Sequence, residues 1–281
     1  MKLSFSEISR LCPILRRKVG EWFVGCAKKL AVPEKLVKDV FGKKRERKVL
    51  ICYLPEAFGG DELPKHHSNL TECRSVANAF DRLGYSVDCA SRGKRGIDYG
   101  RYDVVFGINC HSYAASFGIK GERMPLRVFY SVGAHTFYNF RVTARRNKEF
   151  FERHGKWLLN SCHYVPGNGM NYYMSQLSDV VISLGDSFLQ QQAVIEGDDV
   201  SKVRRLSAFY FNVTSSCSDK DFSKCRNNIL WFGSSGMLHK GLDIAVDFAV
   251  EHPEFTLHIC GGSRQEYEFW SYYKPVVEAH K

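Results

Sequence analysis

Ile229-Leu-Trp-Phe-Gly-Ser-Ser-Gly-Met-Leu-His-Lys-Gly-Leu-Asp243 is the stretch that decides the fold class. Its first four residues are apolar and predict a strand, which ends at the Gly/Ser loop 233–236. Apolar residues then recur with helical spacing from Leu242 to Val250, and a second strand is predicted over 255–260. The order strand, glycine loop, helix, strand predicts a βαβ unit, which is typical of α/β proteins with parallel sheets.

The loop between the first strand and the helix is a candidate phosphate site. Backbone N–H groups at such a turn point outward, and the N-terminus of the following helix carries partial positive charge. Lys240 adds a full positive charge a few residues further on. We therefore predict that Gly233, Ser234, Ser235 and Gly236 bind a diphosphate together with Lys240. The alternative is a Gly-Ser loop that serves only as a tight turn.

The composition is that of a folded protein whose charge is unevenly distributed. The chain has 281 residues, of which 44% are hydrophobic, and a formal net charge of +10. Residues 1–48 hold 14 of the 40 Lys and Arg but only 5 of the 30 Asp and Glu, so nearly all of the excess positive charge lies there. The rest of the chain is close to neutral. We therefore expect no nucleic-acid partner.

The ten cysteines predict a cytoplasmic protein with reduced thiols. None of them forms Cys-x-x-Cys, and their spacing fits neither a disulfide framework nor a zinc site. Cys52, Cys89, Cys110 and Cys260 lie in apolar strand-like runs, and Cys73 lies on the apolar face of a predicted helix, so we expect all five to be buried. The adjacent His66 and His67 lack a third ligand. We expect neither a metal nor a cofactor.

Residues 1–47 are predicted to form a basic amphipathic helical extension. Apolar side chains that include Trp22 and Phe23 share one face, and Pro33 is predicted to start a second helix through Leu36 and Val37. Helices of this kind bind anionic membrane surfaces, which would make the protein peripheral at the inner face of the membrane. A helix packed on the domain, with its lysines in solvent, fits the sequence equally well.

Residues 48–214 are predicted to form a first Rossmann-like domain. Strands are predicted at 49–54, 85–90, 103–109, 126–131, 179–184 and 207–211, and helices at 70–83, 143–154 and 187–196. The polar stretch 215–228 is predicted to be a linker, and residues 229–281 begin a second α/β domain. Arg141, Arg145 and Arg146 are expected either to form a solvated helix face or to meet an acidic acceptor.

Together these features resemble glycosyltransferase family 4, the glycosyl transferases group 1, whose members are retaining, metal-independent enzymes of GT-B fold. The most specific residues are 231–243, with Leu257-His-Ile-Cys-Gly261 after them; Tyr130-Ser-Val-Gly-Ala-His135 and 179–186 add weaker matches. The resemblance covers roughly residues 47–281. It implies a GT-B-like fold in which 48–214 is the acceptor-side domain and 229–281 is a partial nucleotide-sugar donor domain.

The resemblance also assigns roles to residues. It implies that Gly233 to Gly236 and Lys240 hold the donor diphosphate, and that Gly59 and Gly60 approach the same phosphates. His135 matches the histidine near the transferring sugar, with His111 as the alternative. Lys240 and His135 are thus the expected catalytic residues.

The function that the resemblance implies is transfer of a sugar, with retention, from a nucleotide-sugar donor to a glycan or lipid-linked acceptor in polysaccharide biosynthesis. Two features depart from the family pattern. The Arg that usually precedes the loop lysine is missing, and Glu266, Glu268 and Glu278, predicted on one polar helix, do not match the family's glutamate pair. We therefore expect a truncated donor domain. A catalytically inactive relative that acts as a binding or partner module is the alternative function.

Overall fold

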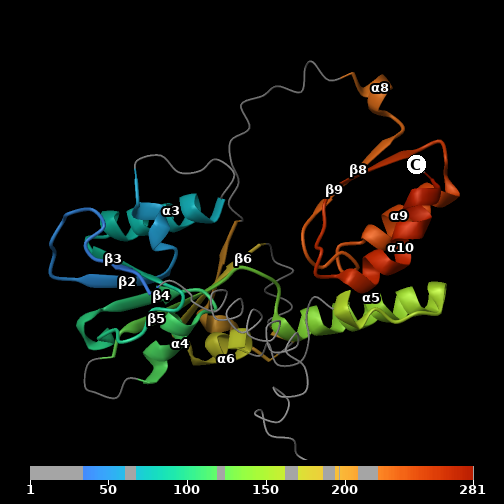
Figure 1. The fold of residues 1–281 in the computed structure, drawn as a ribbon. Coiled ribbons are helices and arrows are strands. Elements are labelled where there is room, and N and C mark those ends of the chain that lie inside the picture. Colours follow the sequence, from blue (N-terminus) through green and yellow to red (C-terminus); the bar gives the residue numbers. More distant parts are fainter. Residues whose placement is uncertain are drawn as a thin grey trace, which may run out of the picture. The chain divides into compact units, whose positions relative to one another are not determined.

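The computed structural model describes residues 34–60, 68–118, 124–161, 170–185, 194–195, 197–207 and 221–280. The chain divides into two compact units, Met1–Tyr130 and Ser131–Lys281. Each unit combines helices with strands that pair mostly in parallel (Figure 1). The predicted α/β class is therefore confirmed, whereas the domain limits at 47, 214 and 228 stay predictions.

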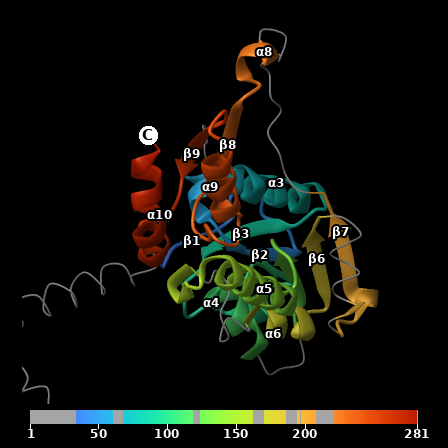
Figure 2. The same cartoon turned by 90° about the vertical axis from the view of Figure 1, so that its right-hand side faces the viewer.

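The first unit contains a sheet with the strand order β1-β3-β2-β4-β5. These strands are β1 (Leu36–Val37), β2 (Lys48–Tyr53), β3 (Ser86–Ser91), β4 (Val104–Gly107) and β5 (Leu126–Ser131). All neighbours pair in parallel except β1, which is antiparallel to β3. Helix α3 (Ser68–Arg82) lies on one face of this sheet and α4 (His111–Ala114) on the other (Figures 1 and 2). Strand β2 is buried over nearly its whole length, as expected for a strand covered on both faces.

The second unit contains two parallel strand pairs. Strand β6 (Val180–Leu184) pairs with β7 (Val203–Leu206), and β8 (Asn228–Gly233) pairs with β9 (Thr256–Gly261). Its helices are α5 (Thr136–His154), α6 (Met170–Leu177), α8 (Phe222–Cys225), α9 (Leu242–Glu251) and α10 (Tyr267–Ala279). The strand, loop, helix and strand predicted over 229–260 are thus confirmed as β8, α9 and β9.

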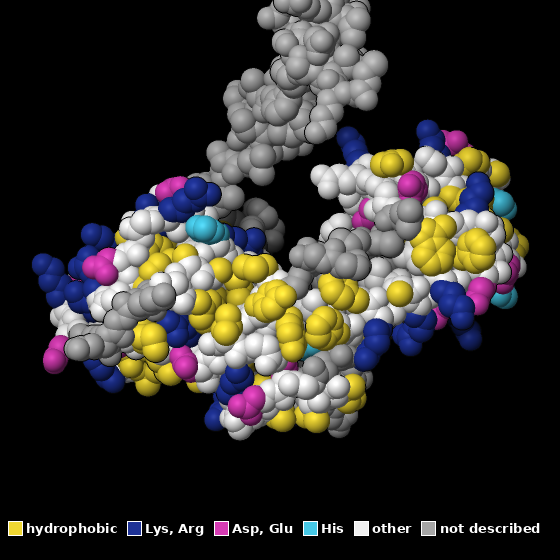
Figure 3. Space-filling view, turned by 90° about the horizontal axis from the view of Figure 1, so that it is seen from below, with side chains coloured by type: hydrophobic (Ala, Val, Ile, Leu, Met, Phe, Trp, Pro, Cys, Tyr) yellow, Lys and Arg dark blue, Asp and Glu magenta, His cyan; other side chains and the backbone are white. Residues whose placement is uncertain are grey.

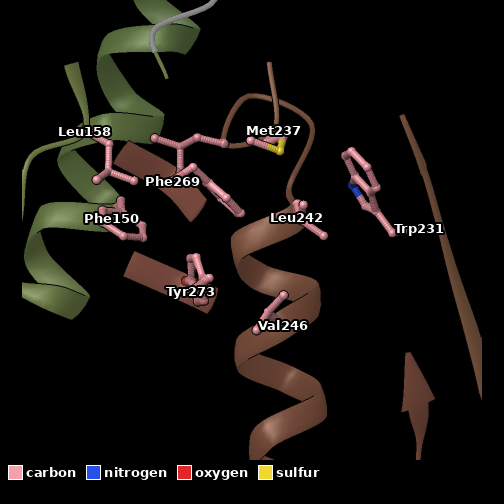
Figure 4. Close-up of a cluster of buried hydrophobic side chains, with 9 residues drawn as sticks. Phe150, Leu158, Trp231, Met237, Leu242, Val246, Phe269 and Tyr273 are labelled. Carbon is pink, nitrogen blue, oxygen red and sulfur yellow. The ribbon is translucent and has the colours of Figure 1, made fainter. Parts of the chain in front are cut away.

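The hydrophobic core of the second unit joins α5 to the C-terminal segment. Phe150 of α5 and the nearby Leu158 pack in one buried cluster with side chains of α9, α10 and β8 (Figure 4). The C-terminal members of this cluster are Trp231, Met237, Leu238, Leu242, Val246, Phe269 and Tyr273. The helix predicted as polar, α10, is therefore amphipathic, because Phe269 and Tyr273 supply an apolar face.

One face of the β8–β9 pair is open to solvent. Leu230 and Phe232 are 64% and 84% exposed, and His258 and Cys260 of β9 are also exposed. The alternate residues Trp231 and Ile259 belong to the core side instead. The prediction of a buried Cys260 is therefore wrong, while Cys52, Cys73, Cys89 and Cys110 are buried free thiols as predicted.

The prediction of a helix that starts at Pro33 is wrong for the described residues, which begin at 34. Leu36 and Val37 form β1, which pairs with Ala90 and Cys89 at the edge of the sheet. The amide of Asp39 donates to the Asp88 carboxylate at 2.8 Å, so hydrogen bonds to the edge of β3 replace those of a helix. The rest of the predicted extension, residues 1–33, lies outside the described residues.

Two other predicted elements differ from the structure. Helix α5 begins at Thr136, seven residues before the predicted start, because His135 caps it. Strand β7 occupies 203–206 rather than 207–211, of which the part from 208 onward lies outside the described residues. Most of the predicted helix 187–196 is also outside them. Among the described residues, no helix is both long and apolar enough to cross a membrane.

Charged side chains on the surface are interspersed. On the face shown in Figure 3, Lys and Arg side chains lie in several separate groups, with Asp and Glu side chains among them. In the first unit, Lys43 and Arg45 each form an ion pair with Asp81 at 2.8 Å. These two cations hold the pKa of Asp81 below its usual value, mainly through the hydrogen bond from Lys43.

Candidate functional site

The predicted phosphate loop lies at the carboxyl end of β8 in the second unit. The indole N–H of Trp231 donates to the carbonyl oxygen of Lys240 at 3.1 Å, which ties the end of the loop back to the strand. The Lys240 amide donates to the Gly236 carbonyl at 2.8 Å, so one tight turn carries both residues. Ser234, Ser235 and Lys240 are exposed, whereas Gly236 is buried.

The glycine pair after β9 fits against the start of this loop. A Cβ on Gly261 would lie 1.8 Å from the carbonyl oxygen of Gly233, and the φ of Gly261 is +107°. The amide of Gly262 donates to the same Gly233 oxygen at 2.9 Å. Any side chain at 261 would break this approach, so Gly261 fixes the relative position of the two loops at the carboxyl ends of β8 and β9.

The amide groups of the loop already bind an anion, and this anion is the carboxylate of Glu266. Its Oε2 accepts a hydrogen bond from the Met237 amide at 2.9 Å, and its Oε1 accepts a short one from the Gly236 amide. Glu266 is only 6% exposed. The sequence indicated an anion site at these amides, but the glutamate that fills it could not be recognised because it lies some 30 residues further along the chain.

Lys240 and Ser234 form the exposed part of the loop. The ammonium nitrogen of Lys240 lies 3.2 Å from the hydroxyl oxygen of Ser234, to which it donates. A cation and a hydroxyl on adjoining backbone turns can bind an anion such as a phosphate oxygen. Ser235 lies beside them and is exposed as well. The predicted residues 233–240 therefore lie in one loop. Within it, Ser234, Ser235 and Lys240 are exposed, whereas Gly236 and Met237 are buried.

Gly59 and Gly60 lie in the first unit, after the 3-10 helix η1 (Pro55–Phe58). The guanidinium of Arg74 donates to the carbonyl oxygens of Ala57 and Gly60, each at 2.6 Å, and so holds the turn. A Cβ on Gly60 would meet nothing within 4 Å, and one on Gly59 would be in ordinary contact. Neither position requires glycine for packing, so close approach to a ligand stays the predicted reason for the pair.

His135 caps the N-terminus of α5 in the second unit. Its Nδ1 accepts a hydrogen bond from the Phe137 amide at 3.2 Å, so a neutral ring carries its proton on Nε2. Nε2 lies 3.5 Å from Oδ2 of Asp198, and both side chains are more than nine-tenths buried. The ring of Tyr172 meets His135 edge-on at 5.8 Å. The alternative, His111, is exposed at the start of α4 in the first unit.

Part of helix α5 lies between His135 and the loop 233–240. Arg146 donates from Nε and Nη2 to the loop carbonyl of Leu238, each at 3.3 Å. The eleven positions between His135 and Arg146 correspond to about 16 Å along a helix axis. The structure therefore places the two predicted catalytic residues in one unit but brings the loop to the middle of α5, not to its histidine.

A buried ion cluster links α5 to α9. Asp243 is fully buried and binds Arg146 and Arg153, both from α5. Burial is the largest single influence on the pKa of Arg146 and lowers it, but the charges and hydrogen bonds of Asp243 and Glu149 together outweigh burial and raise the pKa above its ordinary value. Arg146 is therefore neither the solvated residue nor the acceptor contact expected from the sequence, whereas Arg141 and Arg145 are exposed.

A second polar network lies beside this cluster and lines a groove of about 640 Å³. His154 contacts Asp247 through Nε2 and the Tyr272 hydroxyl through Nδ1, both at 3.0 Å. The Tyr273 hydroxyl donates to Asp247 at 2.8 Å. Burial and this hydrogen bond raise the pKa of Tyr273 well above its ordinary value.

Among the described residues, no three His, Cys, Asp or Glu side chains are grouped as metal ligands.

Comparison of this chain with known proteins returned no matching family model, no matching curated protein and no matching solved structure.

Proposed function

We propose that this chain is a glycosyltransferase that binds the diphosphate of a nucleotide-sugar donor at the β8–α9 loop. It transfers the sugar, with retention, to a glycan or lipid-linked acceptor in polysaccharide biosynthesis. The observation that carries the proposal is the exposed pair of Lys240 and Ser234, 3.2 Å apart, on a glycine loop between a parallel strand and a helix.

The chemistry follows from charge. When the glycosidic bond to the diphosphate breaks, negative charge grows on the leaving oxygen, and a fixed cation at that point lowers the barrier. Lys240 supplies the cation, and the hydroxyl and amides of Ser234 and Ser235 supply neutral donors. The acceptor hydroxyl attacks the anomeric carbon on the face from which the diphosphate leaves; its oxygen forms the new glycosidic bond, and its proton passes to the departing phosphate oxygen. The loop contacts Arg146 in the middle of α5 and not His135 at its start, so the proposal rests on Lys240 and the loop and not on the histidine.

The experiment that tests this function is release of nucleoside diphosphate from uridine and guanosine diphosphate sugars by the full chain and by Lys240→Met. We expect release by the wild type and a loss of at least 100-fold in Lys240→Met. Lys274→Met is the matched control, because Lys274 is also exposed and has only a long ion pair with Glu278 at 3.8 Å. Release by Lys240→Met at the wild-type rate would contradict the proposal.

A non-catalytic relative is the second candidate, and one observation favours it. The amides of Gly236 and Met237 are bound to Glu266 and are not open to a ligand. Such a protein would bind an acceptor or partner without transferring a sugar. Nucleotide sugars at 100 times their Kd would stabilise an enzyme by about 2.7 kcal/mol. If no donor raises the melting temperature, the second candidate is the better description.

We also propose that the basic residues before Pro33 bind an anionic membrane surface. The proposal rests on their charge and on the predicted face that carries Trp22 and Phe23. Sedimentation with vesicles that contain phosphatidylglycerol tests it in the full chain. Replacement of Arg16, Arg17 and Lys18 by Glu is expected to abolish co-sedimentation, and undiminished binding would contradict the proposal.

A further inference from the structure

The backbone amides of Gly236 and Met237 form a small anion-binding site. Both point to one carboxylate, and Gly236 has a φ of +80°, the left-handed conformation that lets consecutive amides converge. Gly236 and Met237 are buried, and so is the carboxylate of Glu266. An internal anion therefore occupies the amides that would otherwise face a ligand of the loop.

The side chain of Glu266 serves this loop rather than its own helix. Glu266 is the N-cap residue of α10, yet its carboxylate makes no capping bond there. The segment that carries it follows Gly261 and Gly262, whose φ angles are +107° and +96°. Residues 263–265 between these glycines and Glu266 reach the surface. The carboxylate is thus carried on a short connection that begins with two glycines.

This anion-binding site and the exposed ammonium group of Lys240 belong to the same turn. The Lys240 amide is bound to the carbonyl of Gly236, and the ammonium of Lys240 reaches Ser234. An anion with two charged groups could bind Lys240 with one group and the Gly236 and Met237 amides with the other. A carboxylate carries one charge, whereas a diphosphate carries more and offers more acceptor oxygens.

We infer that Glu266 is an internal competitor for the donor diphosphate, occupying the amides of Gly236 and Met237 until the diphosphate displaces it. The inference rests on the proposed function and adds a regulatory contact to the same loop. Donor binding then includes an exchange, in which the carboxylate moves to solvent as a phosphate group takes its place. This exchange weakens binding and favours ligands with two linked phosphates over single phosphates.

Calorimetric titration of the full chain with pyrophosphate tests the inference. Glu266→Gln removes the internal charge and one acceptor oxygen, so we expect pyrophosphate to bind at least fivefold more tightly than to the wild type. Glu268→Gln is the matched control, because it removes one charge from the same helix while its carboxylate binds the Asn160 amide, outside the loop. We expect Glu268→Gln to bind like the wild type.

The outcomes separate competition from support of the fold. If Glu266→Gln is folded and binds pyrophosphate no more tightly, Glu266 only braces the loop and the inference is overturned. If Glu266→Gln does not fold, Glu266→Asp replaces it, since a side chain shorter by one methylene reaches the two amides less well. Tighter pyrophosphate binding then supports the inference, and equal or weaker binding overturns it.

Pyrophosphate binding to Lys240→Met tests the proposed function separately from the inference about Glu266. Binding to the wild type that is lost in Lys240→Met supports the function, whatever Glu266→Gln does. If pyrophosphate binds to none of these variants, both the function and the inference are overturned. Amide exchange at Gly236 and Met237 reports the contact directly, and we expect it to be slow in the wild type and faster in Glu266→Gln.

Discussion

A single guanidinium nitrogen of Arg146 lies 2.7 and 2.9 Å from the two carboxylate oxygens of Asp243. The carboxylate is fully buried, and the arginine side chain is 11% exposed. Arg153, two turns further along α5, binds the same carboxylate. One acidic residue of α9 thus fixes two cations of α5, and its loss would leave both without their buried counterion.

Asp243→Asn is therefore expected to lower the free energy of unfolding by about 3 kcal/mol, because breaking a buried ion pair leaves an uncompensated charge. Urea unfolding of the full chain measures this change. Glu152→Gln is the control, since the Lys148–Glu152 pair is exposed and 3.5 Å long. Its loss should change stability by less than about 1 kcal/mol. Equal effects of the two substitutions would show that the buried cluster contributes no more than a surface pair.

Gly261→Ala is expected to be more damaging than most glycine substitutions. The new Cβ would lie 1.8 Å from a backbone oxygen, at a φ that L residues rarely adopt, so β8 and β9 must separate. We expect a loss of more than about 3 kcal/mol in the free energy of unfolding. Gly133→Ala, where a Cβ meets nothing within 4 Å, should change it by less than about 1 kcal/mol. A mild effect of Gly261→Ala would mean that the two loops adjust independently.

Alkaline pH is expected to unfold the protein. Burial raises the pKa of several tyrosine hydroxyls above the ordinary value of 10, so the folded state keeps protons that the unfolded state loses. The stability these groups contribute is complete below pH 10 and falls above it, by about 1.4 kcal/mol per tyrosine and pH unit. The groups are Tyr53, Tyr99, Tyr102, Tyr130 and Tyr273.

Absorbance at 295 nm and circular dichroism, recorded together from pH 9 to 12, measure this effect. We expect the buried tyrosines to ionise in the same transition in which the helices are lost. Tyr273→Phe should make the stability fall less steeply with pH. Ionisation of all tyrosines near pH 10 with the fold intact would contradict the prediction.

Thiol alkylation should separate the cysteines by exposure. Cys260 is exposed and should react with iodoacetamide quickly. Cys52 and Cys110 are buried, and burial raises the pKa of both thiols, so they should react only in denaturant. Mass spectrometry of the peptides gives the extent of reaction at each site. Fast modification of Cys52 in the folded chain would indicate that the sheet of the first unit opens readily.

The sequence was sufficient where local pattern determines structure. The apolar runs predicted β2, β5, β8 and β9 to within a residue or two. Strands β2 and β5 are apolar because both of their faces are buried, whereas β8 and β9 keep an exposed apolar face. It failed for Leu36 and Val37, which look helical until the edge of β3 offers them partners. The glycines and the lysine predicted the loop 233–240, but not the Glu266 carboxylate that two of its amides bind. Glu266, Asp243 and Arg146 meet only through tertiary contacts, and nothing in their local sequence reveals those pairings.

The packing of α5 also determines where this chain can be joined to another in a chimera. By sequence, α5 precedes the polar stretch 215–228 and counts with the first Rossmann-like domain, yet its Phe150 completes the core built by 231–273. A chimera that exchanged only the segment after residue 228 would bring a foreign helix face against Phe150 and two arginines without a matching aspartate. The recombination unit that preserves the contacts is the C-terminal segment together with the inner face of α5.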